Sequence, residues 1–205
     1  MAVDSPTGRR TQQERRERTE SALITAAAEL VVETGLRSLT LARVGERAGY
    51  SRGIVNHHFG SKQALVEALA HATQTGFVPG IDRIAPGLER LLAVVERYIG
   101  ALGGVTVINR AFLLLWAEAA TAPELTEIFR DRDEGFRTRL RADVEAAIAE
   151  GSVRPDTDPG DVAIAIMGQL RGIGLQRLLD PDAIDTERLR HVVAAQWRRA
   201  LTMSD

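Results

Sequence analysis

Apolar residues recur every three or four positions through most of the 205-residue chain, which is the spacing of one face of an α-helix. No run of alternating apolar and polar residues between turn residues indicates a β-strand. We therefore predict an all-α fold. Turn residues divide the pattern into about nine helices, expected at 11–35, 41–48, 52–59, 62–75, 87–102, 106–120, 124–150, 160–179 and 186–201.

Residues that cap helices mark the starts of the first four predicted helices. Thr11 begins the capping-box sequence TQQE before the first helix. Thr40, Ser51 and Ser61 stand directly before the next three helices, where a side-chain oxygen can accept a free backbone N–H. Gly49 stops the second helix, so the second and third helices are short and are joined by a tight turn.

The second and third predicted helices have the lengths of a helix-turn-helix unit, whose second helix enters the major groove of DNA. Two short helices that cross closely need a small residue one turn before the turn glycine, and Gly45 lies four residues before Gly49. In the third helix, Val55 and Phe59 are one turn apart and are predicted to face the core. This pattern favours a DNA-binding unit.

The outward face of the third predicted helix carries side chains that suit the reading of base edges. Arg52 and Asn56 are one turn apart, and arginine and asparagine form bidentate hydrogen bonds with guanine and adenine. Gly53 has no side chain and would let the helix backbone come close to DNA. Taken alone, an ordinary solvated polar face explains these residues nearly as well.

The segment GYSRG at 49–53 also fits the G-x-S-x-G pattern of a hydrolase nucleophile elbow. That mechanism needs a strand running into the serine, whereas the residues before Ser51 are predicted to be helical, and no partner acid and histidine follow in an α/β context. We interpret Ser51 as a helix N-cap and predict no catalytic residue. An all-α serine hydrolase using Ser51 remains the alternative from another class.

Composition narrows the classes of function further. The chain has no cysteine, which removes disulfides, thiolate catalysis and cysteine-based zinc sites and fits a reducing cytosol. The four histidines lack the spacing of a metal site, so we predict no metal and no cofactor. The first residues lack the apolar stretch of a signal peptide, and the longest apolar run, at 111–117, is too short to span a bilayer. We expect a soluble, cytoplasmic protein without a membrane partner.

Charge is distributed unevenly along the chain. Residues 1–62 carry ten basic and seven acidic side chains, a balance of +3, so the remaining 143 residues carry −5 within the formal net charge of −2. A mildly basic front suits contact with a polyanion such as double-stranded DNA. We divide the chain into a flexible arm at 1–10, a helix-turn-helix domain at 11–65 and an effector-binding and dimerisation domain at 66–205.

Residues 24–69 resemble the DNA-binding domain of tetracycline-repressor (TetR) family regulators. The similar features are the first helix ending in ETG, the T-L-x-x-V opening of the second helix, ERAGYSRG across the turn and HFGSK before the fourth helix. The resemblance implies a homodimer that binds a pseudo-palindromic operator and acts as a repressor responsive to a small-molecule effector. A regulator or chromosome-associated protein without a ligand is the alternative within DNA binding.

The resemblance also assigns roles to individual residues. Thr40 and Lys62 are similar to phosphate anchors at helix N-termini, and Lys62 is the only lysine of the chain. The residues similar to the groove-facing set are Tyr50, Arg52, Gly53, Asn56 and His57. The family usually has an aromatic residue, most often tyrosine, at the position of Asn56, so the phosphate contact there is replaced by a base contact or is absent.

Segments 123–136 and 151–185 resemble the C-terminal domain of the branch that includes choline-responsive repressors. We expect the fold and the dimer geometry to carry over, but not the effector. The candidate effector-binding residues are Phe77, Asn109, Phe112, Trp116, Phe129 and Arg171. They could line an aromatic pocket, although ordinary core packing is the favoured role for most of them.

Two apolar stripes near the C-terminus are the candidate dimer surface. They comprise Val162, Ile166, Leu170 and Ile173 on one helix and Leu189, Val193 and Trp197 on the next. The small residues Gly168, Gly172 and Gly174 are expected to let a second helix approach closely. Such stripes suit a four-helix bundle with their two-fold copies, and packing on the helices at 87–150 is the alternative.

Overall fold

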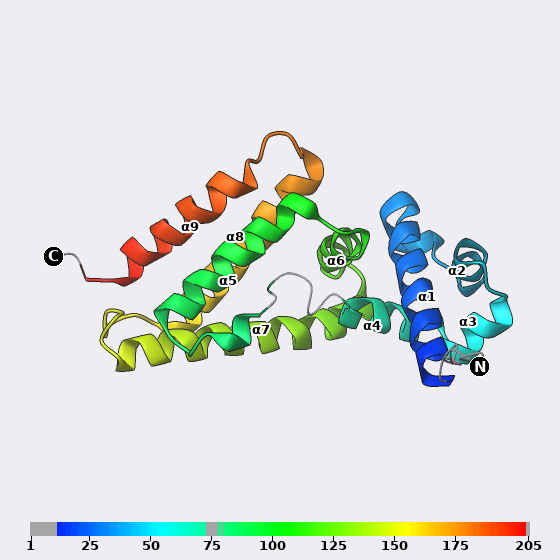
Figure 1. Ribbon diagram of the computed structural model, residues 1–205, viewed down its shortest axis with the longest axis horizontal. Helices are drawn as coiled ribbons and strands as arrows, with labels where there is room; N and C mark the ends of the chain where they lie inside the picture. Colours follow the sequence, from blue (N-terminus) through cyan, green and yellow to red (C-terminus); the bar gives the residue numbers. More distant parts are fainter. Residues whose placement is uncertain (1–11, 73–77, 79, 204–205) are drawn as a thin grey trace, which may run out of the picture.

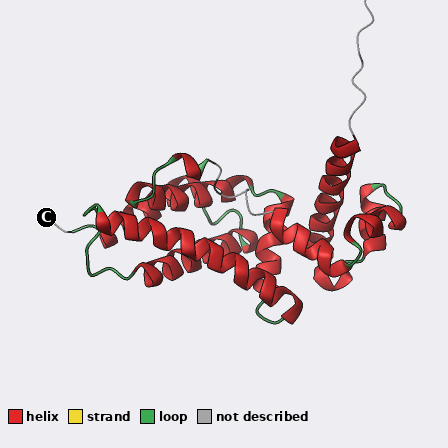
Figure 2. Ribbon diagram, turned by 90° about the horizontal axis from the view of Figure 1, so that it is seen from below, coloured by secondary structure: helices red, strands yellow, loops and turns green. Residues whose placement is uncertain are grey.

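The computed structural model describes residues 12–72, 78 and 80–203, and every regular element among them is helical (Figures 1 and 2). The α-helices are α1 (Gln12–Thr34), α2 (Leu41–Ala48), α3 (Arg52–Phe59), α4 (Lys62–Ala72), α5 (Leu88–Ala101), α6 (Val107–Glu118), α7 (Pro123–Ala149), α8 (Pro159–Leu179) and α9 (Thr186–Leu201). Three short 3₁₀ helices are η1 (Leu36–Ser38), η2 (Ile81–Arg83) and η3 (Leu102–Gly104). The prediction of an all-α fold of about nine helices is confirmed.

Local capping chemistry begins α2, α3 and α4 where the sequence predicts it. The hydroxyl of each capping residue accepts a hydrogen bond from the backbone N–H three residues further on, at 3.2 Å for Thr40, 3.4 Å for Ser51 and 3.0 Å for Ser61. These three predicted caps are confirmed, while Thr11 lies outside the described residues. The helix starts are therefore set by residues adjacent to them in sequence.

Helices α2 and α3 cross at Gly45. A Cβ at this position would lie 2.8 Å from the carbonyl oxygen of Tyr50 and 3.0 Å from Cγ2 of Val55, so a larger residue would push the helices apart. Gly49 ends α2 in the left-handed conformation, with a φ of 74°. Val55 is fully buried and Phe59 is partly buried, as predicted. The helix-turn-helix geometry is confirmed.

The helix-turn-helix end and the larger helical region share one hydrophobic core. The α1–α3 unit lies at one end of the molecule, α5, α7, α8 and α9 lie at the other, and α4 and α6 lie between them (Figure 1). Helix α1 packs against α2 and α6, and α4 contacts both α6 and α7. A change in α6 or α7 can therefore reach the DNA-binding end through direct contacts.

The apolar stripe predicted for the dimer surface faces the core of the chain itself. Helices α5, α6 and α7 cover this side of α8, and α9 packs against α5. Side chains buried in this way pack within the chain itself, as the alternative of packing on the helices at 87–150 expects, and the position of the dimer surface stays a prediction. The buried residues, each no more than 9 % exposed, are Val162, Ile166, Leu170, Ile173 and Val193. Leu189 and Trp197 are partly buried against the same core.

The apolar helices of the larger region belong to this core. Across the described ranges, no single helix is both long and apolar enough to cross a membrane. Leu88–Gly104 and Val107–Glu118 reach that length and hydropathy only as a pair, which is bent by 112°. Apolar side chains of both segments, including Leu91, Tyr98 and Phe112, are buried inside the protein.

Candidate nucleic-acid interface and effector site

Helix α3 presents one polar face to solvent at the outer end of the molecule (Figure 1). The residues exposed on or beside this face are Arg52, Gly53, Asn56 and His57, and Tyr50 in the preceding turn is partly buried. Val55 fixes the opposite side of the helix in the core. The structure therefore brings together the five residues predicted to face the DNA groove.

Gly53 is not required by the fold. An added Cβ would have only the Ser51 hydroxyl within 4 Å, at an ordinary contact distance of 3.7 Å. Glycine inside a helix is unfavourable by roughly 0.5 to 1 kcal/mol relative to alanine. Its presence on the exposed side of α3 fits a helix backbone that comes close to another molecule.

The predicted phosphate anchors stand at the N-termini of α2 and α4, where free backbone N–H groups favour anions. Thr40 is exposed and caps α2. Lys62 Nζ donates a hydrogen bond to the carbonyl oxygen of Leu36 at 2.9 Å, which fixes its position beside η1. Since an ammonium group has three N–H donors, this bond is compatible with a phosphate contact.

Other basic side chains of this end hold the fold together. Arg47 on α2 forms ion pairs with Glu33 at 2.6 Å and Glu29 at 3.2 Å, both on α1. The Arg47 hydrogen bond lowers the pKa of Glu33. Arg43 donates to the carbonyl oxygen of Ser38 at 2.8 Å. These bonds fix α2 on α1 and leave the exposed face of α3 as the candidate surface for base contacts.

Ser51 does not have the surroundings of a nucleophile elbow. It lies between α2 and α3, and its hydroxyl caps α3, so no strand leads into it. In the described part of the chain, no group of three or more histidine, aspartate or glutamate side chains could hold a metal ion. The strand-turn-helix geometry that the hydrolase alternative needs is absent at Ser51.

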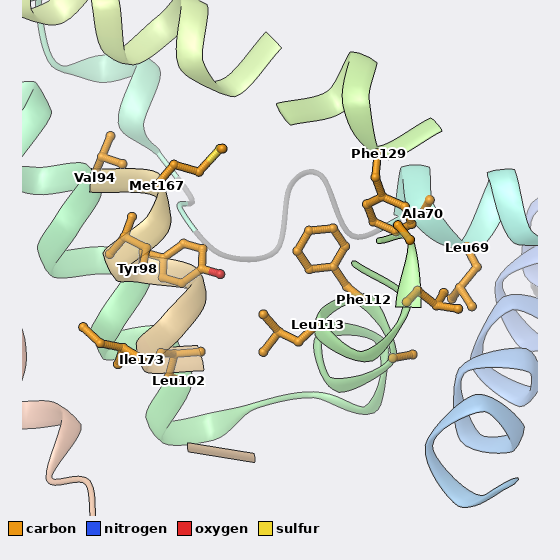
Figure 3. Close-up of a cluster of buried hydrophobic side chains, with 14 of the residues drawn as sticks. Leu69, Ala70, Val94, Tyr98, Leu102, Phe112, Leu113, Phe129, Met167 and Ile173 are labelled. Carbon is orange, nitrogen blue, oxygen red and sulfur yellow. The ribbon is translucent and has the colours of Figure 1, made fainter. Parts of the chain in front are cut away.

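In the larger region, Arg171 of α8 contacts two of the other predicted effector residues, Phe112 and Trp116. It is only 4 % exposed, and its Nη1 donates to the Tyr98 hydroxyl at 2.8 Å. Its guanidinium carbon lies 4.5 Å from the centre of the Phe112 ring and 5.8 Å from that of Trp116. Figure 3 shows Tyr98 of α5 pointing towards Phe112 of α6. Burial raises the pKa of Tyr98.

Asp133 of α7 is the acidic group of this cluster. Its Oδ2 accepts a hydrogen bond from Trp116 Nε1 at 2.7 Å, and its Oδ1 lies 3.6 Å from Nη2 of Arg171. Asp133 Oδ1 and Arg171 Nε are both buried without a hydrogen-bond partner. Sequence reasoning missed Asp133, although a carboxylate at helical spacing between Phe129 and Phe136 was the available signal.

A second arginine, Arg132 of α7, links the cluster to α4. Its guanidinium carbon lies 4.0 Å from the centre of the Phe112 ring, and its Nη1 donates to the carbonyl oxygen of Ala70. Burial and, next, the positive charge of Arg171 lower the pKa of Arg132 to about 10. Phe129, 5.6 Å from Phe112 between ring centres, lies beside Ala70 in Figure 3. Sequence reasoning also missed Arg132.

Asn109 and Phe77 are the other two predicted effector residues. Asn109 is buried on α6, and Phe77 lies outside the described residues. Phe112, Phe129 and Arg171 pack against other side chains, as the core interpretation expects. A role in effector binding stays a prediction for this set.

Helices α8 and α9 also carry large apolar side chains that are exposed to solvent. The exposed apolar side chains are Ile164, Leu179 and Val192, which are 58 %, 87 % and 52 % exposed. A Cβ at Gly168 or Gly172 would meet nothing within 4 Å, so these glycines lie on the open side of α8. Gly174 instead packs against Leu113, with its Cβ position 3.0 Å from Cδ2, and is not available to a second helix.

Two family profiles match the chain over most of its length. Residues 23–69 match the bacterial regulatory proteins of the tetR family. Residues 87–202 match the C-terminal domain of BetI-type transcriptional repressors. The two matches cover both the helix-turn-helix end and the larger helical region.

Curated relatives and solved structures agree with these matches. The chain is 25% identical over 175 residues to the HTH-type transcriptional regulator BetI 1 of Chromohalobacter salexigens, covering 83% of this chain and 84% of the relative. It is 27% identical over 170 residues to BetI of Paraburkholderia xenovorans, covering 80% and 84%. The SmeT–triclosan complex shares the fold with a TM-score of 0.78 at 22% identity, covering 91% of this chain and 93% of that one. Native NalD, the secondary repressor of the MexAB-OprM multidrug efflux pump in Pseudomonas aeruginosa, gives 0.74 at 21% identity, covering 92% and 100%.

Proposed function

Because the chain belongs to the tetR family of bacterial regulatory proteins and is a ligand-responsive DNA-binding repressor of the BetI type, we propose that it acts as a homodimer on a pseudo-palindromic operator. One copy of α3 is a single short helix that reads too few base pairs to be selective. Two copies related by a two-fold axis read two half-sites. The family resemblance predicted from the sequence is confirmed.

The observation that supports DNA reading most directly is the exposed polar face of α3. We assign Arg52 and Asn56 to base edges, because both are exposed one turn apart on the helix that Val55 anchors. Thr40 and Lys62 are assigned to phosphates on either side of this helix. Tyr50, Gly53 and His57 complete the contact surface.

We place the dimer surface on the outward faces of α8 and α9. Ile164 and Val192 expose apolar side chains there, and Gly168 and Gly172 leave room for a helix of the partner. Two such faces related by a two-fold axis would form a four-helix bundle. The two helices are those that the sequence predicts. On α8 the proposed face is nearly opposite to the predicted one, and on α9 it is turned by about 100°.

We propose that the effector acts at the cluster around Phe112 and that the signal leaves it by two short routes. Helix α6, which carries Phe112, packs against α1 of the DNA-binding end. Arg132 hydrogen-bonds to the last turn of α4 through Ala70. A ligand that favours one arrangement of this cluster over another would move α4 and change the spacing of the two α3 helices.

Three further assignments are part of the proposal. The boundary between the DNA-binding and effector domains is placed at 65/66, inside α4. The protein acts in the cytoplasm, where its operator is, and has no enzymatic activity of its own. Residues 1–10 belong to an arm that lies outside the described residues.

Capture of genomic fragments from the source by the purified protein tests the proposed function. The expected result is enrichment of inverted repeats whose half-sites are spaced by about one helical turn, roughly 10 base pairs or a multiple of it, with two chains per repeat. Enrichment of single half-sites, or of no sequence, would contradict the dimeric reading of DNA. A DNA affinity that no metabolite in a broad panel changes would favour the ligand-independent alternative.

A further inference from the structure

The cluster around Phe112 carries more positive than negative charge. Arg132 and Arg171 lie against the ring, with guanidinium carbons 4.0 Å and 4.5 Å from its centre. Among the charges that shift the pKa of Arg132, Arg171 and Arg139 are positive and Asp133 is negative. Buried charge of one sign is unfavourable until an opposite charge joins it.

The carboxylate of Asp133 interacts with both Trp116 and Arg171. One oxygen of Asp133 accepts from the Trp116 indole N–H at 2.7 Å, while the other lies 3.6 Å from Arg171, beyond a good hydrogen bond. Nε of Arg171 is buried without an acceptor, although this side chain is only 4 % exposed. The protein therefore holds a buried, oriented guanidinium donor whose natural partner is a further anionic oxygen.

The walls of the cluster indicate the rest of the ligand. The Phe112 ring lies against both guanidinium groups and beside the Phe129 ring, and the rings of Tyr98 and Trp116 lie within about 6 Å of the Arg171 guanidinium carbon. The guanidinium carbons of Arg132 and Arg171 lie 4.0 Å and 4.5 Å from the centre of the same Phe112 ring. They are therefore close enough together for one small molecule to reach both. Aromatic walls favour an apolar, planar body on the ligand.

We propose that the effector is an organic carboxylate with an apolar body, held through its carboxylate by Arg171 and Arg132. This inference rests on the proposed function, in which the effector acts at this cluster. A cationic effector would meet two guanidinium groups and is disfavoured by their charge. A neutral molecule of the same shape would leave Arg171 Nε without an anionic partner.

Three molecules of matched shape and different charge test the inference on the full chain. Phenylacetate, phenylacetamide and 2-phenylethylammonium are titrated by calorimetry, with benzoate and hexanoate as further carboxylates. We expect at least one carboxylate to bind, and its amide and ammonium counterparts to bind roughly ten- to hundredfold more weakly. Equal or tighter binding of the neutral or cationic members, or no binding of any carboxylate, would overturn the proposal.

Variants locate the binding site. Arg171→Gln is expected to weaken carboxylate binding roughly ten- to hundredfold, while Arg130→Gln, which removes an exposed arginine of α7, is expected to leave it unchanged. Arg171→Lys keeps the charge without the planar fork and serves if the glutamine variant does not fold. Unchanged binding by both Arg171 variants would also overturn the proposal. Operator binding by the ligand-free wild type is measured in parallel. A wild type that binds no operator would contradict the proposed function, but it would leave the result on carboxylate binding unaffected.

Discussion

Two glycines of the helix-turn-helix unit have opposite surroundings. A Cβ at Gly45 would lie 2.8 Å from the Tyr50 carbonyl oxygen, whereas at Gly53 the nearest atom is 3.7 Å away. Gly45→Ala is expected to lower the free energy of unfolding by about 1 to 3 kcal/mol through overpacking. Gly53→Ala should leave it unchanged or raise it by up to about 1 kcal/mol, since alanine favours helices, yet weaken operator binding. Urea denaturation and DNA titration measure both, and an opposite order of stabilities would contradict the crossing at Gly45.

The role of Ser51 as an N-cap can be tested by exchange for other capping residues. Ser51→Ala is expected to lower the free energy of unfolding by about 0.5 to 2 kcal/mol, while Ser51→Asn should be nearly neutral because its side chain can also cap α3. Thermal or chemical denaturation gives the comparison. An esterase activity that is present in the wild type and lost in Ser51→Asn, with folding and DNA affinity unchanged, would instead favour the hydrolase.

The residues that sequence reasoning placed correctly act over short distances along the chain. A cap, a turn glycine or a buried valine at helical spacing is determined by its neighbours within about one turn. Asp133 and Arg132 were missed because their partners, such as Trp116 and Ala70, come from other helices. Which helices meet is a property of the folded chain and has no local signature.

At the scale of single elements, the sequence of α8 predicts a helix but does not predict which of its faces is buried. The helix has an apolar face on both sides, so the sequence indicates an apolar stripe at Ile166 and Leu170 without indicating which face packs inside. Ile164 lies two positions from Ile166, which is nearly the opposite side of a helix. The burial of one face by α5, α6 and α7 decides the question in the structure.

This reassignment leads to a prediction about the two terminal helices. Ile164→Glu combined with Val192→Glu places charges only on exposed positions, so the chain is expected to stay helical but to become monomeric and lose specific operator binding. Ile166→Glu is the matched control, because a charge in the core should unfold the protomer. Light scattering and circular dichroism distinguish the outcomes. A double variant that remains dimeric would place the interface elsewhere.

At the scale of the whole molecule, the two ends are connected through α4 and α6. Arg132→Gln removes the charged donor to the Ala70 carbonyl, and a hydrogen bond from a charged group typically contributes about 1.5 to 3 kcal/mol. Amide hydrogen exchange in the last turn of α4 is therefore expected to become faster, while exchange in α9 stays unchanged. Arg130→Gln is the control for loss of charge. Equal exchange in wild type and Arg132→Gln would show that this bond does not hold α4.

The exposed face of α3 is expected to read DNA bases, and parallel selection from random-sequence duplexes tests this role most directly. Wild type, Arg52→Ala, Lys62→Ala and the control Arg130→Ala are compared on the sites that the wild type selects. Arg52→Ala should lose roughly 1 to 3 kcal/mol on these sites and relax preference at one position per half-site. Lys62→Ala should weaken binding to all sequences and reduce the salt slope by about one. An Arg52→Ala protein that selects the wild-type sequence with full preference at every position would contradict this role.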